Sequence, residues 1–194
     1  MATSMRDFSP YRQGSIVIFP LDPVHCYTKV VTSNNAYMMF VKDFTEIDMP
    51  VTAVLAHLRG QPQSILKNCV EHASQAGVRL LGTLPLDLPR LDTITYSEIA
   101  VSEIVENDNG FVIPVALRDA HLPHLDFDLE FFPMGDQMTR ANLTAFYDVS
   151  SFLLATPLDK RLMQSVAESA ARAFLSCMSA TVTTAAAKEA HSTS

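Results

Sequence analysis

The stretch HLDFDLEF, residues 124–131, constrains the fold more than any other part of the chain. Its polar and apolar residues alternate without interruption. Neighbouring side chains of a β-strand point to opposite faces, so this alternation predicts a strand with one buried and one solvated face. We therefore expect a sheet that covers a core on one side. The apolar set is Leu125, Phe127, Leu129 and Phe131, and the polar set is His124, Asp126, Asp128 and Glu130.

A hairpin is predicted just before this strand, from two apolar segments that flank NDNG at residues 107–110. A three-residue loop at 108–110 pairs Val105 with Ile113 and gathers the apolar residues on one face, whereas a two-residue Asn-Gly loop mixes the faces. The three-residue loop is therefore the predicted register, and the hairpin forms a three-strand meander with 125–131. The residues expected on the core face are Ile99, Val101, Val105, Ile113, Val115 and Leu117.

Further strands are predicted in the first half of the chain. The apolar run SIVIF at 15–19 is one. A hairpin is expected near 24–44, because Asn34-Asn35 suits the positive φ of a tight turn. Residues 78–84, VRLLGTL, are typical of a buried strand, and 50–58 fits either a strand or a short helix.

Three helices are predicted, at 62–76, 136–155 and 158–187. Pro62 suits a first helical turn and Gly77 suits a C-cap, so they bound the first of these. Helices that follow strands without regular alternation indicate the α+β class, with an antiparallel or mixed sheet covered by helices. We expect one domain at 1–187, two C-terminal helices and a loose tail at 188–194.

Charge is distributed unevenly along the chain. The net charge is −7, yet residues 98–136 hold nine acidic residues and one basic residue, which sum to −8. This balance disfavours nucleic-acid binding, which needs clustered Lys and Arg. It favours a cation or a basic protein surface as the partner of this segment.

The same segment contains a candidate metal site at His121, His124, Asp126 and Asp128. Strand residues two apart lie about 7 Å from each other on one face, so the two aspartates could share an ion. The spacing of the histidines matches no zinc-protease motif, because Leu122-Pro123 breaks a helix there. A solvated strand face would give the same alternation without any ligand, and this reading is favoured.

Other parts of the sequence exclude several functional classes. No phosphate-binding glycine loop and no nucleophile elbow is present. No signal peptide and no membrane span is predicted, because no apolar run has the required length. Cys26, Cys69 and Cys177 are expected as free thiols in a reducing compartment. Cys69 and His72, three apart on the predicted helix, are expected to pack rather than to act together.

We therefore predict a non-enzymatic interaction protein, a subunit of a homo-oligomer or larger assembly of viral, phage or secretion type. Its expected location is the cytoplasm or another intracellular site, or the virion. The alternative is a metal-dependent hydrolase built on the four candidate ligands, and only then is a cofactor, a divalent metal, expected. An amphipathic C-terminal helix that covers its own sheet would also explain its Met and Phe stripe. The predicted partner-binding residues are Glu98, Glu106, Asp126, Asp128, Glu130, Met163, Phe174 and Met178.

Overall fold

The computed structural model describes residues 31–33, 36–82, 98–118, 125–148 and 160–192. Helices and strands follow each other in an α+β arrangement, as the sequence predicted. None of the helices within these residues is long and apolar enough to cross a membrane. The elements are β1 (Val31–Ser33), β2 (Ala36–Ile47), α1 (Val51–Gly60), α2 (Pro62–Gly82), β3 (Glu98–Val101), β4 (Val105–Asn107), β5 (Gly110–Arg118), β6 (Leu125–Pro133), β7 (Thr139–Asp148) and α4 (Lys160–Ser192).

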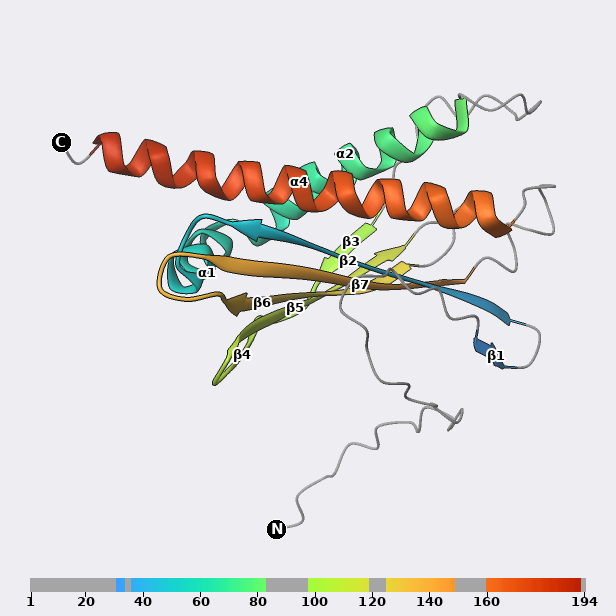
Figure 1. The fold of residues 1–194 in the computed structure, drawn as a ribbon, viewed down its shortest axis with the longest axis horizontal. Coiled ribbons are helices and arrows are strands. Elements are labelled where there is room, and N and C mark those ends of the chain that lie inside the picture. Colours follow the sequence, from blue (N-terminus) through green and yellow to red (C-terminus); the bar gives the residue numbers. More distant parts are fainter. Residues whose placement is uncertain (1–30, 34–35, 83–97, 119–124, 149–159, 193–194) are drawn as a thin grey trace, which may run out of the picture.

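The strands of the described part form one sheet in the order β1-β2-β7-β6-β5-β3, with β4 also paired to β5. Every pair among them is antiparallel. Figure 1 shows α4 running along one side of the sheet, with α2 on that same side. We call the side of the sheet that faces these helices the inner face and the opposite side the outer face.

Strand β6 confirms the prediction from alternation. Phe127, Leu129 and Phe131 are buried on the inner face, while Asp126 and Asp128 are exposed on the outer face. The partner strands continue the pattern, since Ile113 and Leu143 lie opposite Leu129 and are buried as well. The inner face is therefore the floor of the hydrophobic core.

Helix α4 covers the core on the inner face of the sheet. It packs against α2 and β2, and its buried side chains include Phe174, Leu175 and Met178. The Phe174 ring meets Phe127 of β6 edge-on, with centroids 5.4 Å apart. The helix starts close to the predicted position and continues to Ser192, so it includes most of the segment expected as a loose tail. The domain boundaries stay a prediction.

The helix predicted over 136–155 is wrong as far as residue 148, and residues 149–155 lie outside the described residues. Residues 139–148 form β7, which lies between β2 and β6. Its inward residues Ala141, Leu143 and Ala145 are buried, which is an alternation with small side chains. Alanine has high helix propensity and gives a weak apolar signal, so the period of two was easily missed. Pairing with two neighbouring strands overrides that propensity.

The strand predicted at 78–84 is also wrong as far as residue 82, because α2 continues to Gly82. Gly77 lies inside this helix and does not cap it. A Cβ at Gly77 would lie 3.3 Å from Cγ1 of Val166, so the glycine permits a close approach of α4. The predicted start at Pro62 is confirmed, and the ambiguous segment 50–58 is mostly helix α1.

The hairpin register was predicted wrongly. Val105 pairs with Val112 rather than Ile113, around a two-residue loop of Asp108 and Asn109, and Val105 is exposed. Gly110 has φ +143° and a Cβ there would collide with the carbonyl oxygen of Phe131, so only glycine fits. The inward positions predicted on β5 are nevertheless confirmed as buried: Ile113, Val115 and Leu117.

The first predicted hairpin is confirmed in part. Strands β1 and β2 pair antiparallel, with Ser33 opposite Ala36. The turn itself, the strand predicted at 15–19 and residues 24–30 lie outside the described residues.

Candidate functional site

The predicted metal ligands are only partly placed by the structure. His121 and His124 lie outside the described residues. Asp126 and Asp128 share the outer face of β6, as predicted, and both are exposed. Oδ1 of Asp126 lies 2.5 Å from Nη2 of Arg118, so one of the two charges is already paired with a guanidinium group.

The strands beside Asp128 offer it no further acidic ligand. Its direct neighbours are Pro114 on β5 and Thr144 on β7. In the part of the chain that the structure describes, no three His, Cys, Asp or Glu side chains gather closely enough to hold a metal ion. A hard cation needs six or more oxygen ligands, so Asp126 and Asp128 by themselves are a weak metal site.

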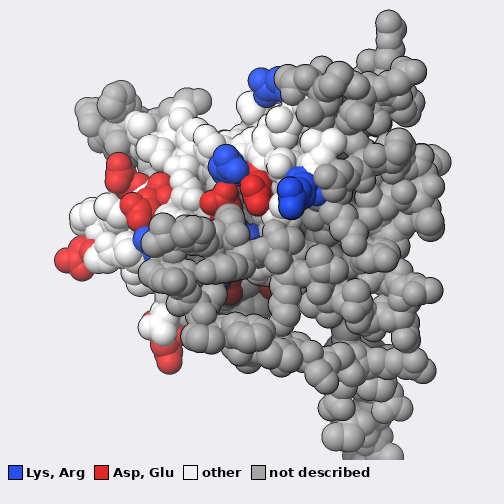
Figure 2. All heavy atoms as spheres, turned by 45° about the vertical axis from the view of Figure 1, so that its right-hand side comes forward, with Lys and Arg blue, Asp and Glu red and all other residues white. Residues whose placement is uncertain are grey.

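The acidic residues predicted to bind a partner do not form one continuous acidic surface. Glu98 lies on β3 opposite Arg118, and Asp126 pairs with that same arginine. Glu106 on β4 pairs with Arg59 of α1. On the face shown in Figure 2, carboxylates and cations likewise lie beside each other near the centre. Arg118, the one basic residue of segment 98–136, therefore forms an ion pair with Asp126 and lies opposite Glu98 in the strand register.

The three apolar residues of the predicted partner surface are buried within the chain itself. Met163, Phe174 and Met178 are residues of α4, and their side chains are buried in the core that this helix shares with the sheet and α2. Their place agrees with an amphipathic helix that covers its own sheet. A partner contact through these three residues stays an untested prediction.

The outer face carries an aromatic group that sequence reasoning missed. Phe40 lies opposite Phe146 on paired strands β2 and β7, with ring centroids 5.1 Å apart. Phe44 lies further along β2, and the guanidinium carbon of Arg140 is 4.7 Å from its ring centroid. Phe44 is 53 % exposed and Phe146 is 45 % exposed. We call Phe40, Phe44 and Phe146 the outer aromatic patch.

The sequence contains each residue of this patch, but it does not show that the three residues share one face. Phe40 and Phe44 are four residues apart, so on a strand they lie on one face. Phe146 was assigned to a helix, and a helical residue would not join that face. The patch is visible only once β7 is known to pair with β2.

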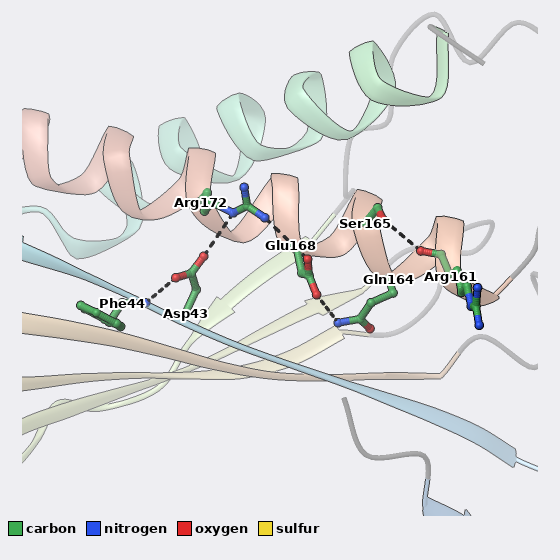
Figure 3. Close-up of polar contacts among 7 residues, drawn as sticks. All are labelled: Asp43, Phe44, Arg161, Gln164, Ser165, Glu168 and Arg172. Carbon is green, nitrogen blue, oxygen red and sulfur yellow. Dashed lines mark hydrogen bonds and ion pairs between the residues drawn. The ribbon is translucent and has the colours of Figure 1, made fainter. Parts of the chain in front are cut away.

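A polar chain on the inner face connects β2 to α4, as Figure 3 shows. Oδ2 of Asp43 lies 3.6 Å from Nε of Arg172, and Nη2 of Arg172 lies 3.5 Å from Oε2 of Glu168. Gln164 donates to Oε1 of Glu168 at 2.7 Å, and the Phe44 amide donates to Oδ1 of Asp43 at 2.9 Å. These contacts position α4 over the sheet, so we assign them a structural role.

Comparisons with known proteins give no family for this chain. No protein-family model and no curated protein matches it. Three solved structures illustrate the likenesses found. A conserved protein from Geobacillus kaustophilus is 13 % identical with a TM-score of 0.46, over 75 % of this chain and 95 % of that chain.

The other two are more distant. Norcoclaurine synthase from Thalictrum flavum is 11 % identical with a TM-score of 0.33, over 84 % of this chain and 96 % of that chain. The human StarD13 lipid transfer and protein localization domain is 10 % identical with a TM-score of 0.27, over 77 % of this chain and 90 % of that chain. All three scores fall below 0.5, so we base neither fold nor function on them.

Proposed function

We propose that the chain is a non-enzymatic interaction protein that assembles with further copies of itself through the outer face of its sheet. One observation carries the proposal: the outer aromatic patch is exposed on neighbouring strands. Aromatic side chains are enriched at the centres of protein interfaces, because they bury a large area at a low entropic cost. Scattered apolar residues on a surface need no explanation, but a contacting pair of rings with a third ring on the same face of two paired strands is a candidate contact.

The charges around the patch support a second copy as the partner. A two-fold interface needs a self-complementary surface, because the same patch is used by both copies. Lys42 and Arg140 lie on the β2–β7 side of the outer face, where Arg140 is paired with Glu46 at 2.9 Å, and Asp128 and Glu130 lie on β6. A two-fold rotation can bring Lys42 of one copy over Asp128 and Glu130 of the other. The acidic residues would then meet a basic protein surface, as the sequence predicted.

The test is the mass of the particle in solution, measured by light scattering over a range of protein concentrations. We expect the full chain to form a discrete oligomer. Exchange of Phe44→Ser together with Phe146→Ser should weaken the association roughly tenfold or more, because central aromatic residues carry much of the binding energy. Far-ultraviolet circular dichroism checks that the variant is folded.

Met134→Ser is the matched control, because Met134 is an exposed apolar residue in the turn between β6 and β7, away from the patch. Its variant should keep the mass of the original protein. A chain that stays monomeric at all concentrations contradicts the proposal. So does an oligomer whose mass is unchanged by the double exchange.

The metal-dependent hydrolase is the weaker proposal, because Asp128 has no acidic neighbour on the adjacent strands. Elemental analysis of the same light-scattering sample tests it. A monomer with about one bound divalent metal per chain would replace the assembly proposal with the hydrolase. An oligomer without stoichiometric metal would leave the assembly proposal standing.

A further inference from the structure

Two cysteines far apart in the sequence meet where α2 packs on α4. The two helices run antiparallel, since Asn68 of α2 meets Cys177 of α4, while Gly77 further along α2 meets Val166 nearer the start of α4. Nδ2 of Asn68 donates to Sγ of Cys177 at 3.6 Å. The glycine allows the helices to approach closely at one end of this contact. Close approach is the condition for a covalent link between neighbouring helices.

Cys69 belongs to the buried core, whereas Cys177 packs against that core and has more access to solvent. Cys69 is fully buried, whereas Cys177 is half-buried. Burial raises the pKa of the Cys69 thiol well above its usual range, and a hydrogen bond with the Cys177 side chain raises it further. Sγ of Cys177 also lies 4.0 Å from Oγ1 of Thr181. Cys177 is therefore the thiol that a reagent in solution reaches first.

We propose that Cys69 and Cys177 form a reversible dithiol–disulfide site that links α2 to α4 covalently. The oxidant we name is a small-molecule disulfide of the glutathione type. The Cys177 thiolate attacks one sulfur of this oxidant, which breaks its S–S bond and releases one small thiol. The Cys69 thiolate then attacks Sγ of Cys177, forms the protein disulfide and releases the second small thiol. The protein loses two hydrogen atoms, and the oxidant gains them.

The disulfide would fix α2 and α4 relative to each other. Residues 69 and 177 enclose strands β3 to β7, so the disulfide closes a long loop around most of the sheet. A long closed loop restricts the unfolded chain strongly and raises the stability of the folded one. The buried thiol slows the second step, because only the thiolate attacks. The site is thus expected to respond over minutes to hours and to sense the redox state of its compartment.

The test uses the full chain, reduced and then incubated with oxidised glutathione, in a Cys26→Ser background that removes the third thiol. Peptide mapping by mass spectrometry should find a peptide pair joined between Cys69 and Cys177, and a dithiol reductant should release it. The oxidised protein should melt roughly 5 to 15 °C higher than the reduced protein. Cys177→Ser should abolish both the linked peptide and the shift.

Two results would overturn the proposal. One is a protein in which both thiols are free, or each is capped by glutathione, after prolonged incubation. The other is a linked peptide pair that forms only when oxidation is carried out in urea that unfolds the chain, since the two thiols would then not meet in the folded protein. Cys69→Ala and Cys69→Ser are compared with each other, so that loss of folding in one variant leaves the other to be measured.

Discussion

Side chains alternate between the two faces of the sheet, and both faces carry phenylalanine. The phenylalanines of the two faces differ in their exposure to solvent. On the inner face Phe111 and Phe131 stack with centroids 4.4 Å apart and are almost fully buried. On the outer face Phe44 and Phe146 remain about half exposed. The inner rings are covered by helices of the same chain, and in the described residues no helix covers the outer rings.

An apolar side chain on a strand can therefore contribute either to folding or to association. Burial of an aromatic side chain removes its surface from water and contributes a few kcal/mol to folding. The same ring on an uncovered face contributes little to folding, so that contribution can go to association. The inner face therefore holds the chain together, and the outer face is the place where we look for a partner.

Removal of an inner ring should have the largest effect on this comparison. Phe127→Ala should lower the free energy of unfolding by roughly 3 to 5 kcal/mol, because it leaves a cavity beneath Phe174. Phe44→Ala, the matched change on the outer face, should cost about 1 kcal/mol or less. Urea unfolding at low protein concentration measures both. Equal losses for the two variants would contradict our assignment of the faces.

A buried polar contact at the start of β7 should have the next largest effect. Oγ1 of Thr139 donates to the carbonyl oxygen of Met49 at 2.7 Å, and Thr139 is fully buried. Thr139→Val keeps the shape and removes the donor, so it should cost about 1 to 3 kcal/mol. Thr183→Val is the control, because Oγ1 of the exposed Thr183 donates to the carbonyl oxygen of Ser179 on α4 at 2.8 Å. A control that loses as much as Thr139→Val would show that burial is not the cause.

Neutralisation of the outer acids should have the smallest effect. Asp126→Asn together with Asp128→Asn removes an exposed ion pair with Arg118, so stability should change by about 0.5 kcal/mol. Thermal unfolding with and without a chelator measures it, and metal content should be the same in the original protein and the variant. If the variant fails to fold without any metal present, the assignment of these residues to a solvated face is wrong.

The sequence predicted those elements whose pattern was strong. The large side chains of β6 alternate without interruption, and the buried residues of α4 recur at helical spacing. The site was predicted less well. Asp126 and Asp128 were placed correctly on the solvated face, but the sequence could not show that Arg118 pairs with one of them.

Three errors have one physical cause. Strand β7 was missed because its inward alanines resemble a helix, and its identity depends on β2 and β6 beside it. The hairpin register was missed because it depends on the contact of Gly110 with Phe131 of the next strand. Gly77 was read as a cap because its real neighbour, Val166, comes from α4. Each of these three features depends on a contact with a residue distant in the sequence.

The sequence by itself determined the class of the fold, the inner and outer faces of β5 and β6, and the apolar stripe of α4. These follow from local periodicity, because side-chain direction repeats along a strand or helix whatever lies nearby. Only the tertiary structure decided which strands are neighbours, which aromatic rings stay exposed and which cysteines meet. Those features depend on pairing and packing between distant segments, whose free energy appears only when the segments are together.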